Sequence, residues 1–158
     1  MLRSVLALGV FGSALGLCIA ADPKPADDLA ALQGNWKPLQ CEFQGKSQMN
    51  ADEMKQTTSV YDKSEYFLYF VDRTNPAKPD VMLIAQANFA LDPTSSPKGI
   101  TFEIAAGSNK GAKQHGIYEL AGNQLKLCYG PTDKPRPTEF KSTAGNGYIL
   151  ETWARQVK

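Results

Sequence analysis

Two neighbouring runs, residues 116–120 and 124–130, show the clearest alternation of hydrophobic and polar positions in the chain. Each places an aliphatic or aromatic residue at every second position, the spacing that puts side chains on one face of a β-strand. Gly122 and Asn123 lie between the runs, and both residue types tolerate positive φ. The pattern therefore predicts an antiparallel hairpin with a tight turn.

Other short runs rich in β-branched or aromatic residues recur between turn-forming residues, a spacing typical of antiparallel barrels and sandwiches. We predict an all-β, up-and-down antiparallel barrel of about eight strands. Segment 81–91 is ambiguous, because its start resembles a strand while its Ala and Gln residues also suit a helix. The remaining predicted strands are residues 35–43, 57–61, 65–71, 99–105, 138–143 and 148–155, the last two pairing as a final hairpin.

Prolines modify two parts of this pattern. Pro38 lies within the first predicted strand and indicates a bulge or an edge near its start, with Leu39, Cys41 and Phe43 sharing one face beyond it. Three prolines follow the central hairpin within seven positions. Because proline has no amide donor, we expect strand pairing to end at this proline segment, which comprises Pro131, Pro135 and Pro137.

Helical signals are short. Residues 28–33 carry leucines at helical spacing, with Asp27 or Asp28 as the candidate N-cap and Gly34 as the stop. A second turn at residues 51–54 is more weakly indicated. Both are predicted to be minor additions to a β-structure.

The first residues have the layout of a secretory signal peptide: Arg3, an apolar core, and small residues at Ala20 and Ala21. We predict a signal peptide over residues 1–21, a flexible leader over 22–28 and a single domain over 29–158, exported to the periplasm or beyond the cell. A membrane anchor is the alternative, although the apolar run is shorter than the ~20 residues of a spanning helix. A lipoprotein would use Cys18, but Leu17 before it is bulky for that site.

The charge balance limits the partners. The chain has 17 basic and 16 acidic residues, and only Arg3 lies in the predicted signal peptide, so the mature chain is electrically balanced. That composition argues against nucleic acid or an anionic membrane surface as a partner. Cys41 and Cys128 remain in the mature chain, and an oxidising compartment would permit a disulfide between them, the alternative being two small apolar core residues.

No catalytic or metal-binding pattern emerges. His115 is the single histidine, and it has no short ligand spacing with either cysteine, so we predict no metal site. A Cys–His nucleophilic pair would need contact that the sequence does not indicate. Nucleophile-elbow and phosphate-binding glycine motifs do not occur. We therefore expect a non-enzymatic protein without a cofactor.

Some motifs resemble known proteins. Gly34, Asn35 and Trp36 resemble the Gly-x-Trp opening of lipocalin-type barrels, in which a basic residue of the last strand commonly lies over the Trp; Arg155 is the matching residue here. The wider pattern LQGNWK, GIYELAGNQLKLCYG and KPRPTEF resembles an uncharacterised, often exported domain family abundant in planctomycete bacteria. The resemblance covers residues 29–155 and implies a lipocalin-like barrel without an assigned activity.

Such a barrel is just wide enough either to be packed solid or to hold one small ligand. We predict binding of a small apolar or amphipathic molecule, with a filled-core interaction or structural module of the cell envelope as the alternative; no protein partner is indicated. Arg136 and Glu139 are predicted to fix a corner of the structure, as Gly34 and Arg155 do at the opening motif. The predicted interior residues are Trp36, Tyr69, Phe102, Tyr118, Leu127 and Phe140.

Overall fold

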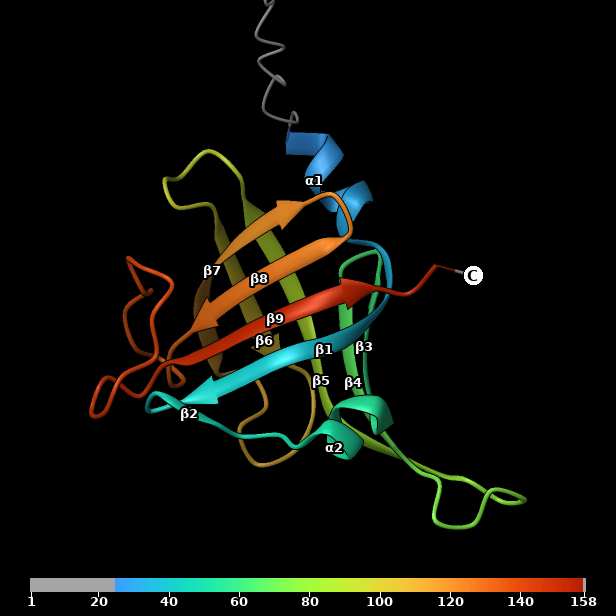
Figure 1. Cartoon of the computed structure of the whole chain (residues 1–158). Coiled ribbons are helices and arrows are strands. Elements are labelled where there is room, and N and C mark those ends of the chain that lie inside the picture. The colour runs from blue at the N-terminus through green and yellow to red at the C-terminus, as the bar shows by residue number, and fades with distance from the viewer. Residues whose placement is uncertain (1–24, 158) are drawn as a thin grey trace, which may run out of the picture.

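The computed structural model describes residues 25–157, which form a closed antiparallel β-barrel of eight strands with a short N-terminal helix (Figure 1). The barrel closes because β1 pairs with β9 as well as with β3. The two-residue strand β2 pairs with β1 alone. The elements in chain order are α1 (Pro25–Leu32), β1 (Gly34–Phe43), β2 (Lys46–Ser47), α2 (Ala51–Gln56), β3 (Thr57–Asp62), β4 (Glu65–Asp72), β5 (Asp80–Asp92), β6 (Gly99–Ile104), β7 (Lys113–Ala121), β8 (Gln124–Tyr129) and β9 (Ile149–Arg155). This confirms the predicted up-and-down, lipocalin-like barrel.

The structure tests only part of what was predicted for the N-terminal residues. The predicted signal peptide, residues 1–21, lies outside the described residues. Helix α1 begins at Pro25, so the prediction that residues 22–28 are a flexible leader is wrong for its last four positions. Proline is favoured at the first helical position because the amide it lacks would have no helical partner there. Asp28 consequently lies within the helix and is not its cap. None of the helices found between residues 25 and 157 has the length and apolar character needed to cross a bilayer.

The ambiguous segment is the longest strand, because β5 covers thirteen residues and pairs with both β4 and β6. The weakly indicated turn is helix α2, which extends two residues further than expected. Its start is a capping box, in which the Asn50 side chain accepts from the backbone N–H groups of Asp52 and Glu53 and the Glu53 carboxylate accepts from the Asn50 N–H.

A bulge interrupts β1 where the sequence places Pro38. The register with β9 shifts between Pro38 and Gln40. Leu39 occupies the bulge and is 50% exposed, so the prediction that it shares a face with Cys41 is wrong. An extra residue in one strand changes which side the following side chains face. The bulge therefore brings Cys41, opposite Glu151 of β9, to the barrel interior.

The predicted final hairpin is also wrong. Residues 138–143 form no strand, and β9 pairs with β8 and β1. The proline segment removes the donors that strand pairing would need, and Arg136 fixes the connection from β8 to β9 against the outside of the barrel. Its guanidinium donates to the carbonyl oxygens of Ile100 and Gly116 and to the Thr101 hydroxyl. This long connection is the red segment beside the barrel in Figure 1.

Helix α1 covers one end of the barrel, which we call the closed end (Figure 1). Trp36 is fully buried there, and its indole N–H donates to the Leu32 carbonyl at 2.9 Å. The Arg155 guanidinium lies 4.3 Å from the centre of the Trp36 ring, as the opening motif predicted. Arg155 also donates to the carbonyls of Gln33 and Ala31 at the end of the helix. Gly34 joins helix to strand with a φ of +108°, which L-residues with a side chain rarely adopt.

A buried polar contact holds α1 to the barrel wall. Asp28 is fully buried and accepts a hydrogen bond of 2.6 Å from the Tyr118 hydroxyl of β7. The ammonium group of Lys98 lies 3.1 Å from the same carboxylate oxygen, Oδ2. The pair satisfies a charge that would be costly to bury alone. Tyr118 of β7 and Lys98, the residue just before β6, thus hold the helix against the closed end.

Candidate binding cavity

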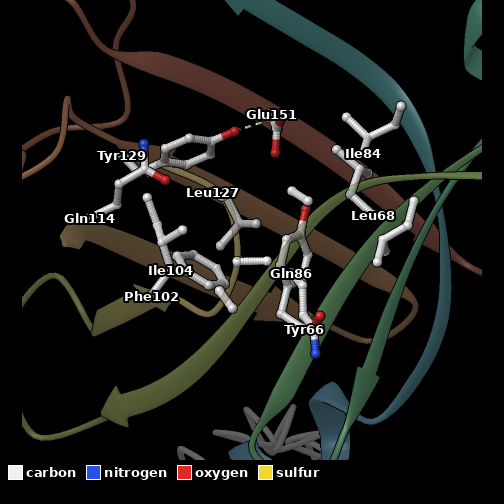
Figure 2. A pocket seen from close by; sticks show the side chains of 15 residues that line it. Tyr66, Leu68, Ile84, Gln86, Phe102, Ile104, Gln114, Leu127, Tyr129 and Glu151 are labelled. Atoms are coloured by element: carbon white, nitrogen blue, oxygen red, sulfur yellow. Dashed lines mark hydrogen bonds between the residues drawn. The ribbon is translucent and has the colours of Figure 1, made fainter. Parts of the chain in front are cut away.

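A cavity of about 380 Å³ occupies the barrel interior toward the end opposite α1. This volume lies within the ~300–1,000 Å³ typical of small-molecule sites. Figure 2 shows the side chains around it: Phe102, Ile104, Leu127 and Tyr66 surround the same space, while Tyr129 and Glu151 form one wall. The remaining lining residues come from β4, β5, the β6–β7 connection and the start of β7: Leu68, Leu83, Ile84, Ala85, Gln86, Ala87, Ala106, Gly107 and Gln114.

Aromatic rings form much of the wall. The ring centres of Tyr66 and Phe102 are 5.1 Å apart, and those of Phe102 and Tyr129 are 6.3 Å apart. These distances are those of tilted and edge-to-face aromatic pairs, which hold ring orientation. The three rings come from β4, β6 and β8, so the barrel itself fixes the shape of the cavity.

Glu151 supplies the one carboxylate among the residues that line the cavity. It is 8% exposed. The Tyr129 hydroxyl donates to Oε1 at 3.0 Å, the Cys41 thiol approaches the same oxygen at 3.7 Å, and the Trp153 indole N–H donates to Oε2 at 3.0 Å. Among the ion pairs formed within residues 25–157, none includes Glu151. The carboxyl group is therefore held by neutral donors only.

The electrostatics follow from this burial. Loss of solvent raises the pKa of the Glu151 carboxyl, against the opposing effect of the hydrogen bonds from Trp153, Tyr129 and Cys41. Burial, and then the Glu151 charge, raises the pKa of the Cys41 thiol to about 12. The pKa values of the Tyr66 and Tyr129 hydroxyls are also raised, by burial first and by Glu151 second. These four groups form one electrostatic cluster at the cavity wall.

The cavity is thus a mainly apolar space with one buried acid. No protein-family model matches this chain. No curated protein matches it either.

We predict that Glu151→Gln changes the pH dependence of stability. A raised pKa in the folded state means that Glu151 favours folding below its ordinary pKa of 4.5, and that this contribution is lost as pH rises through the raised value. Glutamine does not titrate. The free energy of unfolding of the variant relative to the native chain should therefore rise between pH 4 and pH 8, by about 1.4 kcal/mol for each unit of the upward pKa shift.

Urea unfolding at a series of pH values measures this difference. Cys41, Tyr66 and Tyr129 face Glu151, but their raised pKa values keep them protonated over this range. Glu119→Gln is the matched control, because it removes the same charge from an exposed side chain of β7. A relative stability of Glu151→Gln that stays level or falls with pH would contradict the assignment.

The predicted interior residues divide into three groups. Phe102 and Leu127 line the cavity. Trp36 and Tyr118 are buried at the closed end, where they pack beneath α1.

The prediction that Tyr69 and Phe140 lie in the interior is wrong. Tyr69 stacks on Phe67. The Phe140 ring lies 5.0 Å from the ammonium of Lys126, which is next in sequence to the inward-facing Leu127 of β8.

Sequence reasoning missed Glu151, Tyr66 and Tyr129. A signal for the first was present, because Glu151 lies two residues from Trp153 and alternate residues of a strand share a face. With Trp153 buried, Glu151 had to face the interior as well. For Tyr66, alternation gives two faces to 65–71, but the face that turns inward cannot be chosen from a run that is apolar on both. Tyr129 lies two residues after Leu127 on β8, so alternation alone would have placed it beside that predicted interior residue.

The two cysteines of the described chain are free thiols, so the structure does not form the disulfide considered above. Cys41 lies opposite Glu151, whereas Cys128 lies opposite Leu150, so β9 separates them. Neighbouring residues of a strand face opposite sides. The Cys128 thiol accordingly contacts the Lys141 carbonyl and not Cys41. A bond would require a Cα separation below about 7 Å, which strands two places apart do not allow.

His115 and the corner residues have structural contacts. The Nδ1 atom of His115 lies 3.1 Å from the Thr101 hydroxyl, beside Arg136 rather than beside a cysteine. Within residues 25–157 no group of three or more His, Cys, Asp or Glu side chains is arranged to hold a metal ion.

Arg136 fixes the corner as predicted, through backbone carbonyls. In the described chain its hydrogen bonds do not include Glu139, whose carbonyl accepts from the Lys141 N–H.

One lip of the cavity is an exposed apolar segment of β5. Val81, Met82, Leu83 and Ile84 follow one another there, with Leu83 50% and Ile84 57% exposed. The pairing of β5 with β4 shifts between Leu68 and Tyr69, which leaves Ile84 in a bulge. Bulges of this kind commonly occur beside functional sites, where they redirect a side chain. This segment, which we call the β5 lip, gives the cavity an apolar entrance.

Proposed function

We propose that this protein is an exported, non-enzymatic binding protein that holds a small, mainly apolar or amphipathic molecule inside its barrel. The observation that carries the proposal is the 380 Å³ cavity, whose lining is largely aliphatic and aromatic. Removing apolar ligand surface from water contributes about 25 cal/mol per Å². Because most of the lining residues stand on strands of the closed barrel, binding should order few further protein groups, which lowers its entropic cost.

The absence of enzymatic activity is proposed on the chemistry of the cavity wall. The Cys41 thiol contacts Glu151, and a pKa of about 12 keeps it as the thiol, which is the unreactive form. Glu151 has no histidine beside it to form an acid–base pair, since His115 contacts Thr101. The hydroxyls of Tyr66 and Tyr129 are held protonated as well.

Export is part of the same proposal and rests on the signal-peptide pattern of residues 1–21 and on the balanced charge of the remainder. The resemblance to an often exported planctomycete domain family supports it. Intact mass of the protein recovered from the periplasm or the medium tests it, because cleavage after Ala20 or Ala21 removes a defined mass. An uncleaved chain confined to the cytoplasm would contradict export and leave the binding proposal in place.

Binding is tested with N-phenyl-1-naphthylamine, an uncharged probe whose fluorescence rises in an apolar site. We expect a saturable increase with one site per barrel. The increase should be reversed by 1-octanol, which competes for the same space. A fluorescence change that never saturates, or that octanol leaves unaltered, would contradict a defined interior site.

The β5 lip favours a second candidate, an interaction module of the cell envelope that binds a partner protein through an apolar surface. Four exposed apolar residues in succession are unusual at a surface with no partner. The double variant Val81→Ser, Met82→Ser separates the candidates, since neither residue lines the cavity. If the variant no longer cross-links to a protein partner but still binds the probe, the second candidate is supported. If the variant keeps both cross-linking and probe binding, the first candidate is favoured.

A further inference from the structure

We propose that the cavity selects a ligand with a protonated amine, whose ammonium group binds the Glu151 carboxylate while its apolar body occupies the space between Phe102, Leu127 and Tyr66. This inference rests on the proposed function, because it names the ligand class of the same cavity. It follows from the hydrogen bonds of Glu151, its lack of an opposite charge and its position at the cavity wall.

The donors around Glu151 favour its charged form. The Trp153 indole can only donate, so Oε2 is an acceptor. Oε1 receives the Tyr129 hydroxyl and the Cys41 thiol, whose protons are retained because both pKa values are raised. A carboxylate has about four acceptor positions, and three are occupied. An acceptor position is therefore left on a group that borders the cavity.

The described residues around the Glu151 carboxylate provide it with hydrogen-bond donors but with no positively charged partner. Buried charges in proteins are normally paired, because an isolated one is strongly disfavoured. The three ion pairs of the described residues all lie elsewhere, and the nearest hydrogen-bond partners of Glu151 are neutral. An ammonium group would supply both the charge and a hydrogen bond to the free acceptor position, and charge-assisted hydrogen bonds are the stronger kind.

The rest of the cavity sets the other half of the specificity. Phe102 and Leu127 offer apolar surface on the sides away from Glu151, and the Tyr66 ring adds to it while its hydroxyl faces Glu151 (Figure 2). The same geometry disfavours a fatty acid, because a second carboxylate would meet Glu151 in a space of low dielectric constant. It discriminates less strongly against an alcohol, which can donate one neutral hydrogen bond.

Isothermal titration with n-octylamine, 1-octanol and octanoate tests the inference, since the three share one apolar body. At pH 7.5 we expect octylamine to bind about 10- to 100-fold more tightly than octanol, and octanoate to bind most weakly. In Glu151→Gln the advantage of the amine over the alcohol should be lost while octanol affinity changes little. The matched control Glu119→Gln should keep the order of the native chain.

The outcomes are distinguishable. If octanol and N-phenyl-1-naphthylamine bind but octylamine binds no better than octanol, the amine inference is overturned and the binding function stands. If octanoate binds best, Glu151 acts as a neutral acid and the inference is again wrong. If no ligand and no probe binds, the proposed function itself fails. The order among the three ligands on the native chain is informative even where Glu151→Gln does not fold.

Discussion

Ala87→Trp should weaken binding of N-phenyl-1-naphthylamine by about 10- to 100-fold, a loss of roughly 1.4–2.8 kcal/mol. Ala87 is buried on β5 and lines the cavity. It pairs with Tyr66 of β4 on one side and with Ile104 of β6 on the other. An indole at this position would occupy space that the ligand needs. Because the new side chain enters a cavity and not a packed region, the cost in stability should stay within ~1–3 kcal/mol.

Fluorescence titration measures the effect, and Ala87→Leu provides an intermediate step that should give an intermediate affinity. Ala90→Trp is the matched control, since Ala90 is an exposed residue of the same strand. Circular dichroism of each variant reports whether the barrel is retained. Native affinity in a folded Ala87→Trp protein would show that the probe binds somewhere other than the cavity.

Trp36→Ala should lower the free energy of unfolding by about 3–5 kcal/mol, the usual cost of removing a fully buried large aromatic side chain. Three interactions are lost together: the packing of the indole, its hydrogen bond to the Leu32 carbonyl, and its contact with the Arg155 guanidinium. Since these join α1, β1 and β9, the loss affects both the closed end and the strand pair that closes the barrel.

Equilibrium urea unfolding provides the measurement. Leu39→Ala on the same strand is the control, because Leu39 is exposed in the bulge and should change stability by no more than ~0.5 kcal/mol. A similar small effect for Trp36→Ala would mean that the closed end contributes little to the fold, contrary to its burial and contacts.

The fold could be predicted because its signals are local. Alternation in 116–120 and 124–130, with a Gly–Asn turn, defines a hairpin without any information about distant residues. Trp36 and Arg155 were also paired correctly, since the opening motif relates the first strand to the last. The errors arose where a non-local contact overrides the pattern: Arg136 holds the proline segment to β6 and β7, so residues 138–143 do not pair as a strand.

The site was harder to predict because it depends on which face of each strand turns inward. Phe102 and Leu127 lie on cleanly alternating strands and were placed correctly. Tyr69 lies at a register shift in a run that is apolar on both faces, and Phe140 follows the prolines, so neither position could be fixed from periodicity. Glu151 faces the interior, although charged residues are seldom buried. Because acidic residues are usually expected at the surface, Glu151 was not predicted as an interior residue.

A crystal structure of the protein soaked with 8-bromooctan-1-ol would show whether a ligand occupies the barrel, because the anomalous signal of bromine locates the ligand without reference to the protein density. We expect a bromine peak inside the barrel, among Phe102, Leu127 and Tyr66, with the hydroxyl end directed to Glu151. A cavity closed by repacked side chains, or bromine found only on the outer surface or along the β5 lip, would contradict it.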